Sequence, residues 1–126
     1  TLFRSQVQNA GLYQGYVTTL SKRRRRFKFS KTSSKGEMES IKRKIINTKV
    51  QGSAADLMKI AMVRMGRSLK PYNAKMLIQI HDEILVEVHE SKVEEVKVVI
   101  EKAMQDAVNF SIPTPAEAKV AECWIK

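Results

Sequence analysis

Apolar residues recur every three or four positions over a long central stretch of the chain, which predicts a helix buried along one side. Ser34 and Glu37 have the spacing of a capping box, so we expect this helix to begin there. It should continue to about Leu69, because a proline follows two residues later. Gly52 is a weak point within it, since glycine lowers helix stability. We therefore expect one long helix at the centre of the chain.

Two shorter helices are predicted on either side of it. Ser91 and Glu94 repeat the capping-box spacing, and apolar residues then continue at helical intervals to about Phe110. Residues 1–14 also have a helical pattern, but no capping residue or loop precedes them. We therefore expect this first helix to belong to a larger protein that continues upstream of Thr1.

Runs rich in β-branched and aromatic residues predict strands between and after the helices. Residues 16–20 form one such run, which leads directly into a basic loop at 21–36. Residues 75–80 and 83–88 are separated by only two residues, which predicts a hairpin. Residues 119–125 can supply a last strand.

The order of these elements predicts an α+β fold of a single domain, residues 1–126, with helices packed on one face of an antiparallel sheet. A chain of 126 residues with 43% hydrophobic residues is long enough to bury a core. No apolar run approaches the roughly 20 residues that span a bilayer, and no secretory leader is present, so we expect an intracellular protein with no membrane partner. Its single cysteine, Cys123, excludes an internal disulfide, and no Cys/His spacing suggests a zinc site.

The net charge of +10 is concentrated in one part of the chain. Residues 21–50 contain twelve Lys and Arg residues against two Glu residues, and the rest of the chain balances to zero. Such a segment attracts a polyanion, because cations that contact phosphates release condensed counterions. Basic clusters also occur in solvated tails and nuclear-import signals, so the charge by itself leaves these alternatives open.

Three polar residues of the long helix, Arg43, Asn47 and Gln51, follow one another at intervals of four. Side chains with this spacing lie along one side of a helix. Their hydrogen-bond donors suit the minor-groove edge of base pairs, where every pair presents acceptors whatever its sequence. The alternative is an ordinary solvated helix face, and three residues alone do not decide between the two.

The acidic pair Asp82 and Glu83 follows His81 at the turn of the predicted hairpin. Carboxylates held at a turn can bind Mg²⁺, and paired divalent ions can activate an attacking hydroxyl and stabilise a leaving phosphate. Aspartate is also a common turn residue, so this tripeptide alone does not distinguish a metal site from a plain turn.

The combination of three segments resembles the A family of DNA polymerases, in the family's order and at similar separations. These segments are residues 15–20 followed by Arg23 and Arg24, residues 43–56, and residues 79–83. The resemblance covers essentially the whole chain, through to Trp124. The form of residues 50–56, VQGSAAD, leans toward the eukaryotic theta and nu type, for which we expect a nuclear location.

The resemblance implies an incomplete polymerase palm, here its C-terminal part, with an antiparallel palm sheet. Asp82 matches the motif C carboxylate, which organises two Mg²⁺ ions together with a motif A aspartate. Glu83 is then its acidic neighbour, and His81 lies near the primer terminus. The implied reaction is attack of a primer 3′-hydroxyl on the α-phosphate of a deoxynucleoside triphosphate, with release of pyrophosphate.

The resemblance also implies primer-template DNA as a partner. The positions of Arg43, Asn47 and Gln51 track its minor groove in the family. Arg23 and Arg24 match basic residues on the thumb side of the palm that meet the DNA backbone. The neighbouring residues of the same basic cluster, Lys22, Arg25 and Arg26, are also expected to bind DNA.

The chain departs from the family pattern in the basic segment and in its extent. Lys22 occupies a position where the family usually has glycine, and Arg25 and Arg26 replace apolar residues, so we expect a locally different or less ordered loop. The motif A aspartate and the fingers helix lie upstream in the family and are absent from this chain. We therefore expect the chain to be inactive alone and to work with the rest of the polymerase chain upstream.

Two other interpretations remain. The chain could be a non-catalytic DNA-binding module that keeps a polymerase-like palm, in which case the complete protein would not extend a primer. It could also be a basic domain with no nucleic-acid role, in which case no DNA binding would be found even at low salt.

Overall fold

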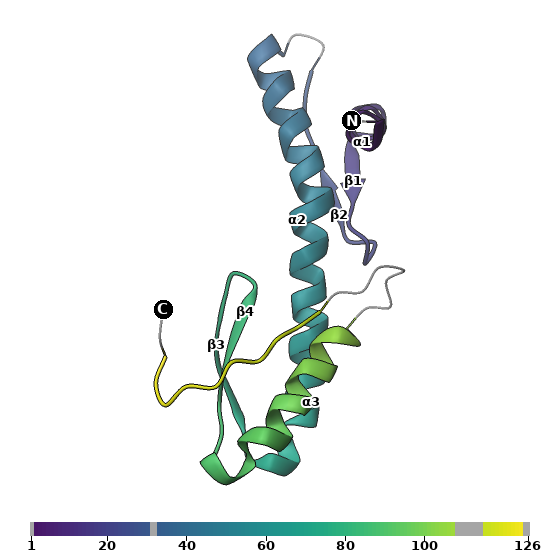
Figure 1. Ribbon diagram of the computed structural model, residues 1–126. Coiled ribbons are helices and arrows are strands. Elements are labelled where there is room, and N and C mark those ends of the chain that lie inside the picture. The colour runs from purple at the N-terminus through teal and green to yellow at the C-terminus, as the bar shows by residue number, and fades with distance from the viewer. Residues whose placement is uncertain (1, 31–32, 108–114, 125–126) are drawn as a thin grey trace. The chain divides into compact units, whose positions relative to one another are not determined.

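The protein is described from a computed structural model, which describes residues 2–30, 33–107 and 115–124. Its helices and strands, in chain order, are α1 (Leu2–Gln14), β1 (Tyr16–Thr18), β2 (Arg24–Arg26), α2 (Lys35–Ser68), β3 (Lys75–Ile80), β4 (Glu83–Glu87) and α3 (Val93–Gln105) (Figure 1). Short 3₁₀ turns lie at Lys70–Tyr72 and Glu90–Lys92. The chain divides into two compact units, residues 1–56 and 57–126, and α2 contributes to both.

The predicted α+β class is confirmed. The described residues form two separate two-stranded antiparallel sheets, β1–β2 and β3–β4, where we expected one sheet. The expected last strand is wrong for residues 119–124, which adopt no regular structure, and residue 125 lies outside the described part. Just before it, Ala118 N donates a hydrogen bond of 3.0 Å to the Glu101 side chain of α3, so this backbone is held by a helix and not by a strand.

In the first unit, α1 packs directly on α2 at Gly11. A Cβ atom on Gly11 would lie only 2.7 Å from Cγ2 of Ile45, a side chain with no exposed surface. The glycine therefore lets the two helices approach closely. Gln8 adds a hydrogen bond across this contact, from Nε2 to the carbonyl oxygen of Lys42 at 3.2 Å.

The hairpin β1–β2 follows α1, which ends at Gln14, and Gly15 between them has a φ of 71°. The two strands are antiparallel, with Tyr16 opposite Arg26 and Val17 opposite Arg25. Arg24–Arg26, which we expected within a loop at 21–36, therefore form a strand. The physical reason is that β1 supplies hydrogen-bond partners for their backbone, and an isolated basic segment offers no such signal.

The long helix α2 begins at the predicted capping box. Ser34 N donates to Glu37 Oε2 at 2.7 Å, and Glu37 N donates to Ser34 Oγ at 3.2 Å, which confirms the reciprocal cap. Gly52, which we expected to be a weak point, has a packing role in the first unit. A Cβ atom there would lie 3.0 Å from Cγ2 of Thr19, so the glycine lets the β1–β2 hairpin lie close against α2.

In the second unit, β3 and β4 form the predicted hairpin, with Ile80 opposite Glu83. The register shifts by one residue between Met76 and Ile78, which makes a β-bulge. One face of this sheet packs on a core of buried residues, which are Met65 of α2, Leu69 just after that helix, and Val96 and Ala103 of α3. On β3, Leu77 and Ile78 remain about half exposed, at 53% and 50%. Helices thus cover one face of this sheet, as predicted.

The start of α3 differs from the prediction. Ser91 and Glu94 do not form a capping box, because a 3₁₀ turn at Glu90–Lys92 precedes the helix. The side chain of His89 accepts a hydrogen bond from Ser91 N at 3.3 Å and caps this turn instead. The helix ends at Gln105, and the predicted end at Phe110 lies outside the described residues. Within the described part of the chain, no helix is both long and apolar enough to cross a membrane.

Candidate functional site

The acidic turn joins β3 to β4 in the second unit. His81 and Asp82 are the two residues between the paired positions Ile80 and Glu83, and His81 has a φ of 54°, which is uncommon for a residue with a side chain. Gln79 Nε2 donates a hydrogen bond of 2.6 Å to the carbonyl oxygen of His81. The backbone of this turn is therefore held by two strands and an amide side chain, while the side chains of His81, Asp82 and Glu83 are exposed.

The donor set at this turn fits part of a magnesium site. Asp82 and Glu83 place two exposed carboxylates next to each other. Mg²⁺ is commonly held by one or two carboxylates, with waters and substrate phosphates as its other ligands. Across the described ranges, no group of three or more His, Cys, Asp or Glu residues is arranged to hold a metal ion. A complete site would therefore need ligands from outside these residues.

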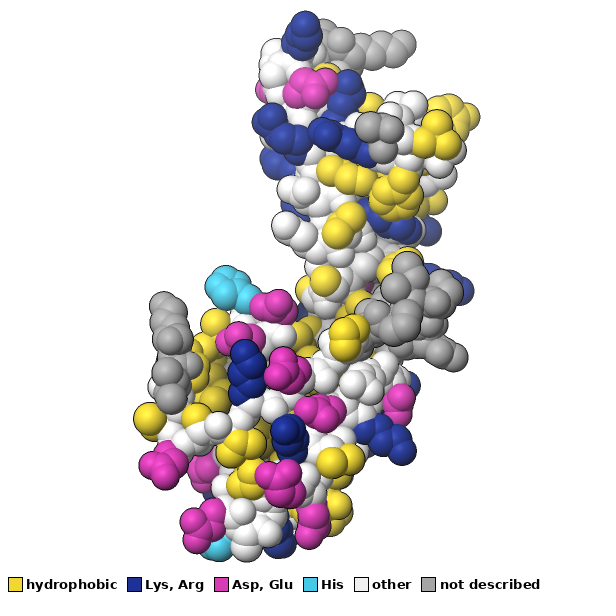
Figure 2. All heavy atoms as spheres, viewed as in Figure 1, with side chains coloured by type: hydrophobic (Ala, Val, Ile, Leu, Met, Phe, Trp, Pro, Cys, Tyr) yellow, Lys and Arg dark blue, Asp and Glu magenta, His cyan; other side chains and the backbone are white. Residues whose placement is uncertain are grey.

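The net positive charge of the chain comes entirely from the first unit. Residues 1–56 contain thirteen Lys and Arg residues against three Asp and Glu residues, whereas residues 57–126 contain ten of each. Figure 2 shows Lys and Arg side chains gathered over the first unit, and a mixture of both charges over the second. The excess of +10 therefore makes the first unit the part of the chain that attracts a polyanion.

The polar row lies on α2 within this basic unit. Arg43, Asn47 and Gln51 are all exposed, and none of their side chains forms a hydrogen bond or ion pair with the residues that the structure describes. Their spacing puts them on one side of the helix. The donors of all three are thus available to a ligand, as a groove-reading row would require.

The five basic residues of the hairpin fall into distinct environments. Arg24 and Arg26 are exposed on β2, and the Arg24 guanidinium lies 4.3 Å from the centroid of the Tyr16 ring. Arg25 points its Nη1 to Thr48 Oγ1 of α2, at 3.0 Å.

Lys22 is exposed and has a φ of 66° in the hairpin turn, where its backbone N donates to the carbonyl oxygen of Thr19 at 3.0 Å. It thus adopts the left-handed conformation that a glycine would take more easily. Two backbone hydrogen bonds close this turn, from Lys22 N to Thr19 O and from Thr19 N to Arg23 O, whereas we expected local differences or less order here.

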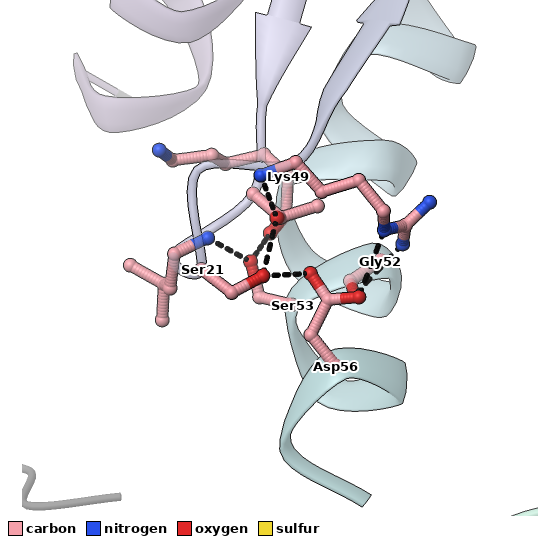
Figure 3. A network of polar contacts seen from close by, with 8 residues as sticks. Ser21, Lys49, Gly52, Ser53 and Asp56 are labelled. Carbon is pink, nitrogen blue, oxygen red and sulfur yellow. Dashed lines mark hydrogen bonds and ion pairs between the residues drawn. The ribbon is translucent and has the colours of Figure 1, made fainter. Parts of the chain in front are cut away.

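Arg23 anchors the turn of this hairpin to α2 through Asp56, which is labelled in Figure 3. Its Nε donates to Asp56 Oδ1 at 2.9 Å, and its Nη2 donates to the carbonyl oxygen of Gly52 at 3.3 Å. The second carboxylate oxygen of Asp56 accepts a hydrogen bond from the Ser21 hydroxyl. Ser53 adds a further link, since its Oγ accepts from Leu20 N at 3.0 Å.

These contacts change the acidity of Asp56. Hydrogen bonds from the hydroxyls of Ser21 and Thr19, and then the bond and the positive charge of Arg23, lower the pKa of this carboxyl group to about 2. Burial acts in the opposite direction but is outweighed. Asp56 is therefore a charged and nearly buried carboxylate, with 9% of its side chain exposed, within a strongly basic unit.

Sequence reasoning did not identify Asp56 as a site residue. One signal could have found it, because Asp56 is the only acidic residue between Glu39 and Asp82. A single acid within a basic and apolar helix needs a partner if it is buried. Its partner, Arg23, lies 33 residues away in the sequence, so no local pattern connects the two.

The predicted site residues are distributed over both units. The polar row, the basic hairpin and Asp56 belong to the first unit, and the acidic turn belongs to the second. That the turn and the row act on the same DNA duplex therefore stays a prediction.

Comparisons with known proteins bear on the whole chain. The sequence profile of DNA polymerase family A matches residues 2–126. The thermostable DNA polymerase I of Thermus filiformis is 40% identical over 116 residues, which are 92% of this chain and 14% of that protein. DNA polymerase I of Streptococcus pneumoniae is 38% identical over 124 residues, or 97% of this chain and 14% of that protein.

A solved structure is similar as well. It is described as the POL domain of Pol1 from M. smegmatis in complex with DNA primer-template and dNTP. The match has a TM-score of 0.83 and 30% sequence identity, and it covers 88% of this chain and 20% of that one.

The comparisons show how much of a polymerase the chain represents and to which family it belongs. It spans about 14% of the length of the polymerases it matches. The relatives named here are bacterial, so the expected leaning toward the eukaryotic theta and nu type, with its nuclear location, finds no support. With a profile match over residues 2–126 and an α+β fold shared with a polymerase domain, the chain belongs to DNA polymerase family A.

Proposed function

We propose that the chain is the C-terminal part of the palm of a DNA-directed DNA polymerase, which adds deoxynucleotides to a primer 3′-hydroxyl. The observation that carries this proposal is the exposed Asp82 and Glu83 pair on a strand-held turn, in a chain that matches the polymerase family over residues 2–126. The similar M. smegmatis structure, which contains primer-template and dNTP, supports the choice of substrates.

In this proposal Asp82 would hold Mg²⁺, with Glu83 as the neighbouring carboxylate. When bound, the metal would activate the attacking hydroxyl and stabilise the charge on the leaving phosphate. An aspartate outside this chain would complete the site, since the described residues provide only part of a ligand set. His81, exposed beside Asp82, would lie near the primer terminus.

The first unit would hold the primer-template. Its charge of +10 favours the DNA backbone, and the exposed row Arg43, Asn47 and Gln51 suits acceptors of the minor groove. Arg24, Arg26 and Lys22 are exposed and would contact phosphates. Arg25 already donates to Thr48, so its contribution would be mainly to hold β2 on α2.

We propose that the chain does not polymerise by itself. It spans about 14% of its polymerase relatives, and the upstream motif A aspartate and fingers helix would come from the rest of the polymerase chain. Polymerase activity and DNA binding should therefore be measured with the complete protein.

The test is primer extension by the complete protein carrying Asp82→Asn. We expect a loss of about 10³-fold or more in rate, because metal stabilisation of a transferring phosphate contributes several kcal/mol. DNA affinity should change little. Glu87→Gln is the matched control, since Glu87 is an exposed acid at the other end of the same hairpin and its substitution should leave extension unchanged.

Wild-type extension by Asp82→Asn would contradict the catalytic assignment. If the complete protein bound primer-template but did not extend it at all, the chain would instead be part of a DNA-binding module with a polymerase-like palm.

A further inference from the structure

Arg23 is both anchored by hydrogen bonds and exposed to solvent. Its guanidinium is held by two hydrogen bonds, from Nε to Asp56 and from Nη2 to the Gly52 carbonyl. More than half of its side chain, 53%, nevertheless remains exposed. Arginine has five N–H donors in a fixed plane, and these bonds use only two of them. The remaining donors belong to a guanidinium whose orientation is already set.

Asp56 is in turn held from the other side. The Ser21 hydroxyl donates to its Oδ2, and the hydroxyl oxygens of Ser21 and Thr19 lie 3.1 Å apart. Arg23 N donates to Thr19 Oγ1 at 3.1 Å, so the chain of contacts returns to Arg23 itself. In Figure 3 the Ser21, Ser53 and Asp56 side chains point toward one another between the hairpin turn and α2. The carboxylate therefore cannot rotate away without breaking several bonds.

A carboxylate in this place is unfavourable by charge alone. The first unit would attract DNA more strongly without it, because the Asp56 charge opposes a field of thirteen Lys and Arg residues. If Asp56 favours DNA binding, it must therefore do so by fixing the orientation of a neighbouring group and not by its charge. A guanidinium held in one orientation loses less conformational entropy when it binds a phosphate than a freely rotating one does.

We propose that Asp56 is a positioning residue that orients the Arg23 guanidinium toward a phosphate of the bound DNA. This inference rests on the proposed DNA-binding function of the first unit. It concerns a residue that the sequence does not mark as part of the site. Its effect on DNA affinity has the opposite sign from that of a simple change in charge.

The experiment measures primer-template affinity of the complete protein over a range of salt concentrations. Asp56→Asn has almost the same shape and removes one negative charge. Glu39→Gln is the matched control, because Glu39 is an exposed acid on the same helix, paired with Lys42 at 2.7 Å, and its loss changes the charge by the same amount. Charge alone predicts that both variants bind DNA as tightly as the wild type or more tightly.

Positioning predicts a different result for Asp56→Asn. Its affinity should fall about five- to tenfold at 0.1 M salt, and the slope of log K against log salt should become shallower by up to about 0.9, the value for one phosphate contact. Arg23→Ala should show the same two changes. The double variant should be no weaker than Arg23→Ala, because both substitutions remove one contact. A role limited to stability would change the melting temperature without changing the slope.

Arg23→Lys keeps the test decisive if Asp56→Asn does not fold. Lysine retains the charge at an exposed position but cannot make both anchoring bonds. We expect it to lose most of the affinity that Arg23→Ala loses, and wild-type affinity and slope in Arg23→Lys would overturn the proposal.

The inference and the proposed function can fail separately. If Arg23→Ala weakens binding while Asp56→Asn behaves like Glu39→Gln, the positioning role is wrong and DNA binding stands. If the wild type shows no salt-dependent binding of primer-template, the proposed function itself is wrong.

Discussion

Lys22 has an unfavourable backbone conformation that is imposed by the hairpin turn around it. Its φ of 66° lies in the left-handed region, which costs a residue with a side chain roughly 1 kcal/mol more than glycine. The hydrogen bonds of the turn hold it there, from Lys22 N to Thr19 O and from Thr19 N to Arg23 O. A residue-scale strain is thus compensated by the hairpin around it.

Lys22→Gly should therefore stabilise the protein by about 0.5–1 kcal/mol, because glycine adopts this φ without steric cost. Thermal or urea unfolding of the purified protein measures the change. Lys28→Gly is the control, since Lys28 is exposed and has no positive φ, and it should be neutral or slightly destabilising. A lower stability for Lys22→Gly would show that the turn does not strain this residue.

The depressed pKa of Asp56 makes a contribution to stability that depends on pH. The folded-state pKa is about 2 and the ordinary value is 3.8, so the contribution is fully present above about pH 4 and is lost as pH falls toward 2. Asp56→Asn should lower stability by about 1–3 kcal/mol at neutral pH, because the amide keeps only one of the two acceptor oxygens that Arg23 and Ser21 use and carries no charge to pair with Arg23. The stability difference from the wild type, followed by urea unfolding from pH 7 down to pH 2.5, should narrow below pH 4. A difference that is constant with pH would contradict this assignment.

At the scale of elements, two glycines allow α1 and the β1–β2 hairpin to pack closely against α2 in the first unit. Gly11 brings α1 onto α2 at Ile45, and Gly52 brings the hairpin onto α2 at Thr19. In both contacts a neighbouring side chain, Ile45 or Thr19, lies where a Cβ atom on the glycine would be. The two glycines therefore determine which elements pack against the helix that carries the polar row.

Gly11→Ala tests this packing. The new Cβ would lie 2.7 Å from a fully buried Ile45 side chain, so we expect a loss of about 1–3 kcal/mol as α1 moves or Ile45 leaves its rotamer. Gly36→Ala is the matched control in α2, where the nearest atom is 4.0 Å away, and it should be neutral or slightly stabilising. Equal melting temperatures for the two variants would contradict a close contact at Gly11.

At the scale of the whole molecule, charge is divided unequally between the two units. The first unit carries the entire excess of +10, and the second has none. The acidic turn of the second unit would be repelled by DNA phosphates without cations, which fits its proposed use with Mg²⁺. Substitutions in the basic hairpin should therefore affect DNA affinity more than the chemical step.

Arg24→Ala and Arg26→Ala in the complete protein should each make the salt dependence of primer-template binding shallower, by up to about 0.9 in log K against log salt. Arg25→Ala should change this slope less, because its guanidinium already donates to Thr48. Titrations at several salt concentrations measure all three. An Arg25 effect as large as the others would mean that its bond to Thr48 does not persist when DNA binds.

The sequence by itself determined the elements that depend on local signals. The Ser34 and Glu37 cap, the span of α2 and the two-residue turn at His81 and Asp82 were all predictable, because helical period, capping and turn length act between residues near in the chain. The three motifs, in the family's order and at similar separations, also identified the family. The cap predicted at Ser91 was wrong, since His89 competes for the same backbone donor.

Only the tertiary structure decided the contacts between distant segments. That Arg24–Arg26 form a strand depends on pairing with β1. That Asp56 holds Arg23 depends on folding the hairpin onto α2, which brings together two residues 33 positions apart in the sequence. The approach of α1 to α2 at Gly11 is likewise decided by the space beside Ile45. The residues in these contacts have no distinctive local sequence pattern. The free energy of each contact depends on distances and burial in the folded state, which cannot be read from a short stretch of sequence.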